Sequence, residues 1–346
     1  ATTYIYTLSL HDALPISGNI FGDISFKDSL FWGNGWMWDD DPSTDAPYFS
    51  PLNINDNAVQ VNVKTTEENK LTEVVLAPES NYFSLTNLST TKLNEKNNFV
   101  VTRDFLNRTN EIIVKGNFSR NYSTRLNVFA PEKYFLTLFE EKLNNKNIEF
   151  EGKLLFDTIP NHSQLLYQIK RNYLNVLPNL NKYSDNLSTE MVLYAMAEKY
   201  FGQPATAENG IKLIDSMITL SGLQPASYRI VDGSGVSHYN LISTELLLKI
   251  LKYFYYNHSD LYVILKNSFP IAGVDGTLKN RMRNNSTLNN VYAKTGTLSG
   301  VSSLSGYLNS SSGNYIAFSI MIQNYVGRSI NATKYIDEVC KILAEY

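Results

Sequence analysis

The pattern of apolar and polar residues changes near residue 164. Before it, short apolar runs alternate residue by residue with polar ones. After it, longer segments carry apolar residues three and four positions apart. Alternation is typical of half-buried strands, and the wider spacing is typical of amphipathic helices. The sequence therefore predicts a strand-rich first half and a helix-rich second half.

The first half contains a series of short strands. In NAVQVNV, Val59, Val61 and Val63 alternate with small or polar residues, which predicts a half-buried strand. NNFVVTR and NEIIVKG follow, separated by polar turns, and indicate a small all-β unit. TRLNVFA is predicted as a further strand. Pro131 then opens a helix over PEKYFLTLFEEKLNNKN.

The second half predicts helices over NLSTEMVLYAMAEKYF, TAENGIKLIDSMITLSG and STELLLKILKYFYY. VYAKTGTLSGVSSLSGYL and NYIAFSIMIQN are predicted as two strands joined by the turn NSSSGN. The final helix is expected to bury a stripe of Ile336, Val339, Cys340 and Leu343.

The opening text has a different character. TTYIYTLSLHDALPIS back-translates naturally to a sequencing-adapter oligonucleotide, so residues 1–17 are interpreted as a cloning or assembly artefact. The alternative is a genuine short strand. On the first interpretation, the natural start of the protein and any export signal are not part of this sequence.

Composition excludes several classes of function. Of 346 residues, 43% are hydrophobic and 18% are charged, which is typical of a globular protein, and a net charge of −3 argues against nucleic acid as a partner. One cysteine, Cys340, excludes an internal disulfide framework, and four scattered histidines predict no metal site. No cofactor is expected, and no apolar run is long enough to cross a bilayer.

The most specific chemical motif is Lys294-Thr295-Gly296, which is followed by Thr297 in a predicted strand. A lysine ammonium and a threonine hydroxyl at a strand edge can bind a carboxylate, and a glycine lets an acyl group approach the backbone. The alternative is a surface lysine beside a β-bulge glycine.

A second motif, Ser184-Asp185-Asn186, stands directly before a predicted helix. By itself, Ser184 is best explained as a helix N-cap. A Ser-x-Asn at a helix start, upstream of a Lys-Thr-Gly strand, is however the arrangement of penicillin-recognising serine enzymes.

The resemblance extends over nearly the whole chain after Ser17. SDNLSTEM, VDGSGVSHYN, PIAGVDGTLKNR and AKTGTLSGVSSLSGY occur in the order and spacing of one family, and GWMWDD and LNINDNAVQV also resemble it. The chain is similar to the class C low-molecular-mass penicillin-binding proteins, which form the peptidase S13 or D-alanyl-D-alanine carboxypeptidase/endopeptidase family.

This resemblance implies an α/β (α+β) fold of the β-lactamase/transpeptidase type, with an antiparallel sheet flanked by helices and two inserted domains. Residues 64–123 would be the inner, all-β insert, and residues 18–63 and 124–163 the outer one. Residues 164–346 would be the catalytic domain, without its N-terminal part.

It also implies a periplasmic or extracytoplasmic serine D-Ala-D-Ala carboxypeptidase, with endopeptidase activity, that binds peptidoglycan stem peptides and β-lactams. Ser184 would relay a proton to the leaving group, and Asn186 would hold the substrate amide. Lys294 and Thr295 would bind the terminal carboxylate.

Five further residues complete these expectations, and Gly296 is part of the catalytic strand. Thr297 would offer a backbone N–H to the oxyanion, and Leu298 would line the pocket. Trp36, Asp39 and Tyr48 occupy positions comparable to an aromatic and acidic patch that receives the amino end of the stem peptide. Ordinary loop packing is the alternative for these last three.

The nucleophile is the missing element. The family's Ser-x-x-Lys motif should precede the inserts, upstream of Gly18, whereas the one match in this chain is Ser89-Thr90-Thr91-Lys92, which is expected to occur by chance. The chain as given is therefore predicted to be inactive. A non-catalytic peptidoglycan-binding relative is one alternative. A β-lactamase is another, although the two inserts and the Asp-Gly-Ser-Gly run argue against it.

Overall fold

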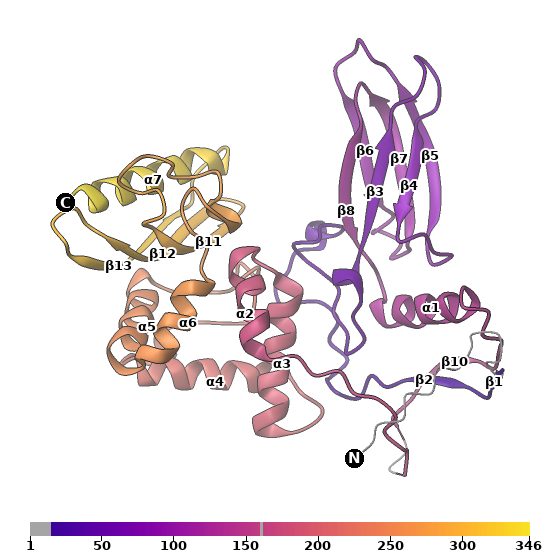
Figure 1. Cartoon of the computed structure of the whole chain (residues 1–346), viewed down its shortest axis with the longest axis horizontal. Helices are drawn as coiled ribbons and strands as arrows, with labels where there is room; N and C mark the ends of the chain where they lie inside the picture. The colour runs from indigo at the N-terminus through magenta and orange to yellow at the C-terminus, as the bar shows by residue number, and fades with distance from the viewer. Residues whose placement is uncertain (1–14, 160–161) are drawn as a thin grey trace, which may run out of the picture. The chain divides into compact units, whose positions relative to one another are not determined.

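The computed structural model describes residues 15–159 and 162–346. The chain divides into two compact units, residues 1–164 and 165–346 (Figure 1). The division lies beside residue 164, where the sequence predicts the catalytic domain to begin. The assignment of the earlier residues to an outer and an inner insert stays a prediction.

Two three-stranded sheets form the centre of the first unit. One has the order β4-β3-β8, and the other has the order β5-β7-β6, in which β5 and β7 run parallel. The strands are β3 (Ala58–Lys64), β4 (Glu73–Ala77), β5 (Ser84–Thr91), β6 (Asn98–Arg103), β7 (Glu111–Phe118) and β8 (Tyr122–Asn127).

The core of this unit lies between strands of both sheets. Val59, Val61 and Val63 are buried and pack with Ile112 and Val114 of β7, which confirms the alternation predicted for β3. Most of β3 and β8 lies outside residues 64–123, the range predicted for the inner insert, yet both strands contribute to this one core.

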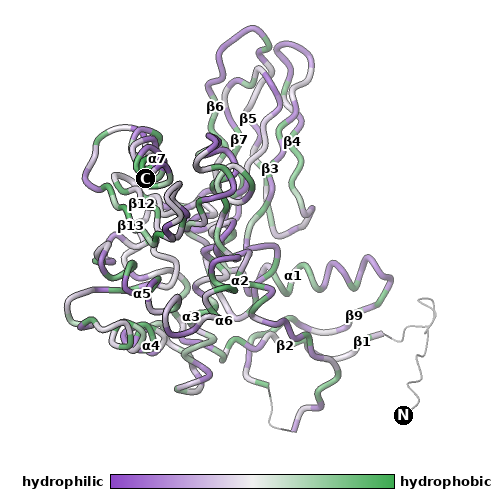
Figure 2. Tube along the Cα trace, turned by 60° about the vertical axis from the view of Figure 1, so that its left-hand side comes forward, coloured by the Kyte–Doolittle hydropathy of each residue, from purple (hydrophilic) through white to green (hydrophobic). Residues whose placement is uncertain are grey.

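Smaller elements surround the sheets. Helix α1 (Pro131–Asn144) begins at Pro131 as predicted and alternates polar and apolar turns (Figure 2). Short parallel pairs join β1 (Ile16–Ser17) to β9 (Phe150–Glu151) and β2 (Ile20–Gly22) to β10 (Leu154–Phe156). The 3₁₀ turns are η1 (Trp38–Asp40) and η2 (Asn55–Asn57).

The interpretation of residues 1–17 as an artefact falls mostly on residues 1–14, outside the described residues. Of the remainder, Ile16 and Ser17 form the exposed two-residue strand β1, which is compatible with both interpretations.

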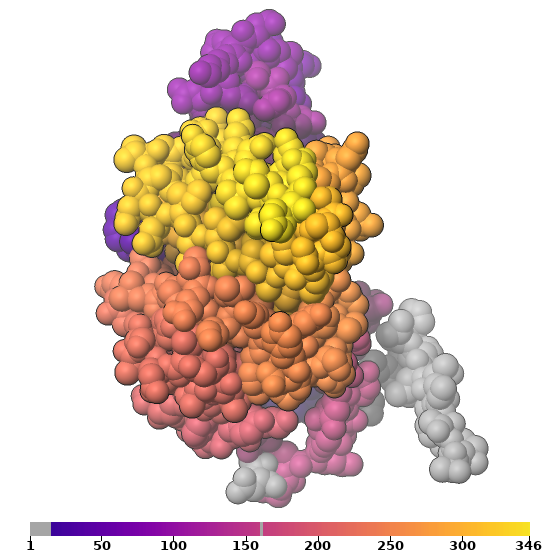
Figure 3. Space-filling view, turned by 90° about the vertical axis from the view of Figure 1, so that its left-hand side faces the viewer, coloured from indigo at the N-terminus to yellow at the C-terminus, as the bar shows by residue number. Residues whose placement is uncertain are grey.

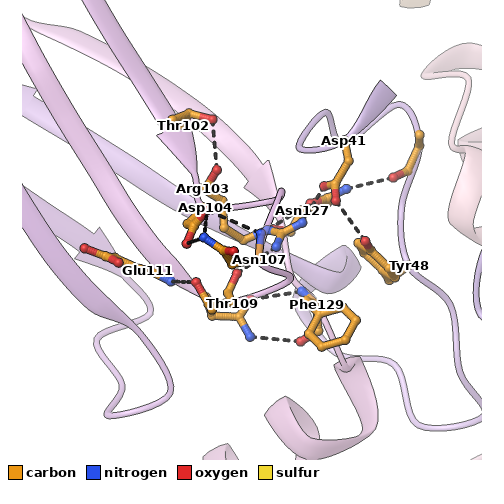
Figure 4. Close-up of polar contacts among 12 residues, drawn as sticks. Asp41, Tyr48, Thr102, Arg103, Asp104, Asn107, Thr109, Glu111, Asn127 and Phe129 are labelled. Carbon is orange, nitrogen blue, oxygen red and sulfur yellow. Dashed lines mark hydrogen bonds and ion pairs between the residues drawn. The ribbon is translucent and has the colours of Figure 1, made fainter. Parts of the chain in front are cut away.

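A buried arginine holds the loop around Asp41 against the strands (Figure 4). Arg103 is fully buried and forms an ion pair with Asp41. It also donates to Thr109 O at 2.7 Å and to Asn127 Oδ1 at 3.1 Å, while Tyr48 Oη donates to Asp41 Oδ2 at 2.8 Å. A buried ion pair requires such additional hydrogen bonds to offset its desolvation. The cluster therefore fixes this loop.

The second unit combines six helices with an antiparallel sheet in the order β11-β12-β13. The strands are β11 (Tyr292–Leu298), β12 (Val301–Asn309) and β13 (Tyr315–Gln323). The helices are α2 (Tyr173–Lys182), α3 (Asn186–Phe201), α4 (Ala207–Leu220), α5 (Thr244–Asn257), α6 (Ser259–Ser268) and α7 (Ser329–Glu345), with the 3₁₀ turns η3 (Pro225–Ser227) and η4 (Gly276–Leu278).

Helices cover both faces of this sheet. On β12, Leu304 and Leu308 pack into the same cluster as Ile336 of α7, while Tyr307, which points to the opposite face, packs with Leu251 of α5. The space-filling view shows α7 (yellow) at the surface of the unit (Figure 3). The expected flanking of an antiparallel sheet by helices is thus present in this unit.

Two details differ from the sequence prediction. The segment predicted as one strand before NSSSGN is a hairpin, because Gly300 takes a positive φ of 72° and allows a two-residue turn between Leu298 and Val301. In α7, Val339 is 41% exposed, so its assignment to the buried stripe was wrong. The buried positions, Ala332, Ile336, Cys340 and Ala344, repeat every four residues and form a narrower stripe.

Candidate active site

Ser184 lies in the turn between α2 and α3, with its backbone in the left-handed region at φ 58°. The N-cap of α3 is Asp185, whose Oδ1 accepts a hydrogen bond from Ser188 N at 3.1 Å. The alternative interpretation of Ser184 as the helix cap is therefore wrong. A serine seldom adopts positive φ, and residues held there occur often at functional sites.

The decisive contact of this site joins Ser184 to Lys294. Lys294 Nζ donates to Ser184 Oγ at 2.8 Å, across 110 residues of sequence, and also to Thr295 O at 2.9 Å. The structure thus brings together residues from the two motifs that the sequence singled out. Since the Ser184 oxygen accepts from lysine, its own proton can point to a third group.

Burial lowers the pKa of Lys294 from 10.5 to about 8. Desolvation disfavours the charged form of an amine, which moves its pKa towards the pH at which a group can both give and take a proton. The Lys294 amine is therefore suited to supply a proton through Ser184.

Thr295 contacts a residue outside the two motifs. Its Oγ1 lies 2.9 Å from Oγ1 of Thr277, and either hydroxyl can be the donor. Thr277 belongs to η4, in the run Gly-Val-Asp-Gly-Thr-Leu that carried part of the resemblance.

The remainder of β11 forms an edge of the sheet. Gly296 lies against β12, where a Cβ atom would come within 2.5 Å of Ser303 Oγ. Thr297 is exposed and Leu298 is partly buried at the end of the strand. Among the described residues, β12 is the one strand paired to this stretch, so alternate backbone N–H groups of the outer edge point away from the sheet.

Asn186 is the first residue of α3 and is partly buried. It therefore lies at the same end of the helix as the Ser184 turn.

A buried carboxylate one turn further along α3 holds a loop that the sequence did not assign to the site. Glu190 is 1% exposed and accepts hydrogen bonds from Gly233 N at 3.0 Å and Ser234 N at 2.8 Å. Burial raises the pKa of its carboxyl, while hydrogen bonds from Ser234 and Gly233 oppose this rise. Asp232 in turn accepts from Ser237 N at 2.7 Å. The Asp-Gly-Ser-Gly run thus forms a rigid loop attached to α3.

The three residues expected to receive the amino end of the substrate lie in the first unit. Trp36 and Tyr48 are only 6% and 5% exposed, so little of either side chain is available to a ligand, and the Tyr48 hydroxyl already binds Asp41. Burial raises the Tyr48 pKa to about 12. Asp39 is exposed, and its neighbour Trp38 is 70% exposed.

Ser89 and Lys92, the one Ser-x-x-Lys match, do not form a nucleophilic pair. Ser89 is fully buried in β5, and its Oγ donates to Asn87 Oδ1 at 2.6 Å. Lys92 pairs instead with Glu95 at 3.4 Å. An acyl-forming serine must be accessible and next to its base.

Within residues 15–159 and 162–346, no group of three or more His, Cys, Asp and Glu side chains is arranged to hold a metal ion. The helices of this same part are too short or too polar to cross a membrane.

The D-Ala-D-Ala carboxypeptidase 3 (S13) family matches residues 12–345. The chain belongs to this family. The match begins within residues 1–17, the range interpreted as an artefact, and it includes both units of the S13 chain.

Curated relatives support the same placement. The chain is 29% identical over 330 residues to D-alanyl-D-alanine carboxypeptidase DacB of Haemophilus influenzae, covering 90% of this chain and 66% of the relative. It is 27% identical to a D-alanyl-D-alanine carboxypeptidase of Actinomadura sp. strain R39, covering 96% and 64%. The S13 chain therefore spans slightly less than two thirds of the length of these relatives.

Solved structures agree on the fold. Penicillin-binding protein 4 (dacB) of Haemophilus influenzae superposes with a TM-score of 0.81 at 25% identity, covering 95% of this chain and 75% of that one. A complex of that protein with a β-lactam gives a TM-score of 0.72 at 24% identity, covering 86% and 71%. The fold of this S13 chain is thus the mixed α/β fold of penicillin-binding protein 4.

Proposed function

We propose that this chain contributes the substrate-binding and proton-transfer part of a serine-type D-Ala-D-Ala carboxypeptidase site, which acts on peptidoglycan stem peptides outside the cytoplasm and also as an endopeptidase. The observation that carries the proposal is the hydrogen bond from Lys294 Nζ to Ser184 Oγ. Family membership supports the reaction type.

The proposed chemistry has two parts. Lys294 and the Thr295 hydroxyl bind the C-terminal carboxylate of the stem peptide, because an ammonium and a hydroxyl are strong donors to a carboxylate. Ser184 passes its proton to the amide nitrogen of the departing D-alanine and regains one from Lys294, whose pKa of about 8 permits this exchange near neutral pH. Asn186 holds the substrate amide, and the Thr297 N–H stabilises the oxyanion, with Gly296 and Leu298 beside it.

Of the three residues predicted for the amino end of the substrate, Asp39 takes this role in our proposal because its side chain is the one that is exposed. It is exposed, whereas Trp36 and Tyr48 act in our proposal as the packed support of its loop. Exposed Trp38, which stacks on Phe105 with ring centroids 6.1 Å apart, supplies an aromatic surface next to that carboxylate.

Binding of a short peptide tests the proposal without requiring acyl transfer. A diacetyl-L-lysyl-D-alanyl-D-alanine peptide is titrated into the protein by NMR, alongside the same peptide with a C-terminal amide. We expect the acid to bind at least about tenfold more tightly than the amide, since a hydrogen-bonded charge pair is lost with the carboxylate. Lys294→Ala should abolish that preference, and Lys279→Ala, which changes an exposed lysine of the neighbouring loop, should retain it. Equal binding of acid and amide by the unaltered protein would contradict the proposal.

A further inference from the structure

The proposed site has two halves, the turn that carries Ser184 and the strand that carries Lys294 and Thr295. One short segment lies against both. Residues 270–278 follow α6 and include η4. Ala272 N donates to Val291 O at 2.9 Å and Ala293 N donates to Pro270 O at 3.1 Å, so the segment runs beside the start of β11. Leu278 is fully buried in the core beneath the sheet, which anchors the end of the segment.

Asp275 and Gly276 attach this segment to the turn that carries Ser184. Asp275 forms an ion pair with Lys182, two residues before Ser184, and its other oxygen accepts from Ile271 N at 2.9 Å. Gly276 has a φ of 55°, and a Cβ atom there would come within 2.5 Å of Lys182 O. The segment and the end of α2 are therefore packed backbone to backbone, at a distance that only glycine allows.

Thr277, the next residue, attaches the same segment to the strand that carries Lys294. Its hydroxyl lies 2.9 Å from that of Thr295. Three consecutive residues, 275–277, thus contact both Lys182, two residues before Ser184, and Thr295, next to Lys294. The two motifs themselves are joined by the contact between Lys294 and Ser184.

The geometry points to Thr277 as a positioning residue for carboxylate recognition. Residues 275–277 form a bridge that holds the Ser184 turn and the Lys294–Thr295 strand in a fixed position relative to one another. This inference rests on the proposed function, because it names how that site orients its ligand. Thr277 acts through Thr295 and need not contact the substrate.

The physical basis is the direction of one hydroxyl. When Thr277 donates to Thr295 Oγ1, the Thr295 proton points to a further acceptor, and a carboxylate takes that place when substrate binds. Consecutive hydrogen bonds of this kind polarise one another. A Thr295 hydroxyl whose rotation is already fixed also loses less entropy when the ligand binds. Without Thr277, the Thr295 hydroxyl must find its orientation when the ligand arrives.

Two variants of Thr277 test this role. Thr277→Val removes the hydroxyl and keeps the shape, while Thr277→Ser keeps the hydroxyl. Both should fold, because the side chain is exposed. With the acid and amide peptides described above, we expect Thr277→Val to weaken binding of the acid by about three- to tenfold, the loss of one hydrogen bond, and to leave binding of the amide unchanged. Thr277→Ser should restore the preference for the acid.

The outcomes separate this inference from the function on which it rests. If the unaltered protein prefers the acid and Thr277→Val keeps the full preference, the inference is wrong and the proposed function stands. If the unaltered protein shows no preference, the proposed function fails. Equal weakening of acid and amide binding by Thr277→Val would indicate a general structural role and would also overturn the inference.

A second variant tests the other end of the bridge. Asp275→Asn removes the ion pair with Lys182, so the Ser184 turn should move away from Lys294 and expose it. The pKa of Lys294, followed by NMR after reductive ¹³C-methylation of the lysines, should then rise from about 8 towards 10.5. An unchanged Lys294 pKa in folded Asp275→Asn would show that the bridge does not hold the two halves together.

Discussion

Lys294 is a partly buried amine whose hydrogen bonds go to a serine hydroxyl and a backbone carbonyl. Neither partner is negatively charged, so burial dominates and lowers the pKa of the amine. A carboxylate ligand would supply the missing charge. The free site is therefore electrostatically prepared for an anionic group.

This predicts the pH dependence of peptide binding. Below pH 8 the Lys294 amine is protonated, and it loses its proton as the pH rises through about 8. Affinity for the D-Ala-D-Ala acid should accordingly be constant at low pH and fall by about tenfold per pH unit above that pKa. The carboxylate stabilises the ammonium, so the pKa in the complex should be higher than in the free protein. Peptide titrations from pH 6 to 10 measure the affinity at each pH and, from its pH dependence, the Lys294 pKa in the free protein and in the complex. An affinity that does not change with pH would contradict the assignment of Lys294.

The positive φ of Ser184 gives a second prediction at the residue scale. Left-handed backbone costs roughly 1–2 kcal/mol for a residue with a Cβ atom and nothing for glycine. The greater freedom of glycine in the unfolded chain offsets part of this difference. Ser184→Gly should therefore be about 1 kcal/mol more stable than Ser184→Ala in urea unfolding. Both variants should lose the contact with Lys294, and equal stabilities of the two would show that the turn is not strained.

At the scale of elements, the loop of residues 232–237 depends on a single carboxylate of α3. The buried Glu190 carboxylate accepts from two part-buried backbone N–H groups. Because unsatisfied buried donors are costly, the loop and the helix are expected to behave as one unit.

Glu190→Ala should lower the free energy of unfolding by roughly 2–4 kcal/mol, from lost hydrogen bonds and a cavity, whereas Glu190→Gln, which keeps one acceptor oxygen, should lose less. Hydrogen exchange at the amides of Gly233 and Ser234 should accelerate in Glu190→Ala. Unchanged protection of these two amides would mean that the carboxylate does not hold the loop.

Sequence patterns predicted local elements better than contacts between them. The alternation in 58–63, the helix start at Pro131 and the end of α4 before Gly222 follow from rules that act over a few residues. The two site motifs were recognised by residue type. The hairpin turn at Gly300 was missed because the strands on both sides are equally apolar.

The roles of Thr277 and Glu190 were not predictable in the same way. Each depends on a partner 18 or 43 residues away, and a threonine or glutamate in a single sequence carries no sign of that partner. The run Gly-Val-Asp-Gly-Thr-Leu was noticed through resemblance, but its bridging position required coordinates. The burial of Trp36 and Tyr48 likewise depends on ring packing with Trp32.

At the scale of the whole molecule, the site motifs in residues 165–346 and the Ser-x-x-Lys match at 89–92 belong to different units. The buried Ser89 hydroxyl cannot attack a β-lactam without unfolding of β5. Ser89 should therefore remain unlabelled by a fluorescent penicillin under native conditions. Mass spectrometry that located a stoichiometric penicilloyl adduct on Ser89 would contradict this expectation.

The 110 residues between Ser184 and Lys294 also have a consequence for how the protein folds. Closing so long a loop is entropically costly, and the contact gains its energy only after α3, α5 and the hairpin of β11 and β12 have formed. The site should thus assemble late, after most of the secondary structure of its unit. In stopped-flow refolding, the recovery of peptide binding should lag behind the recovery of far-ultraviolet circular dichroism, so that the time course of folding itself reports when the two halves meet.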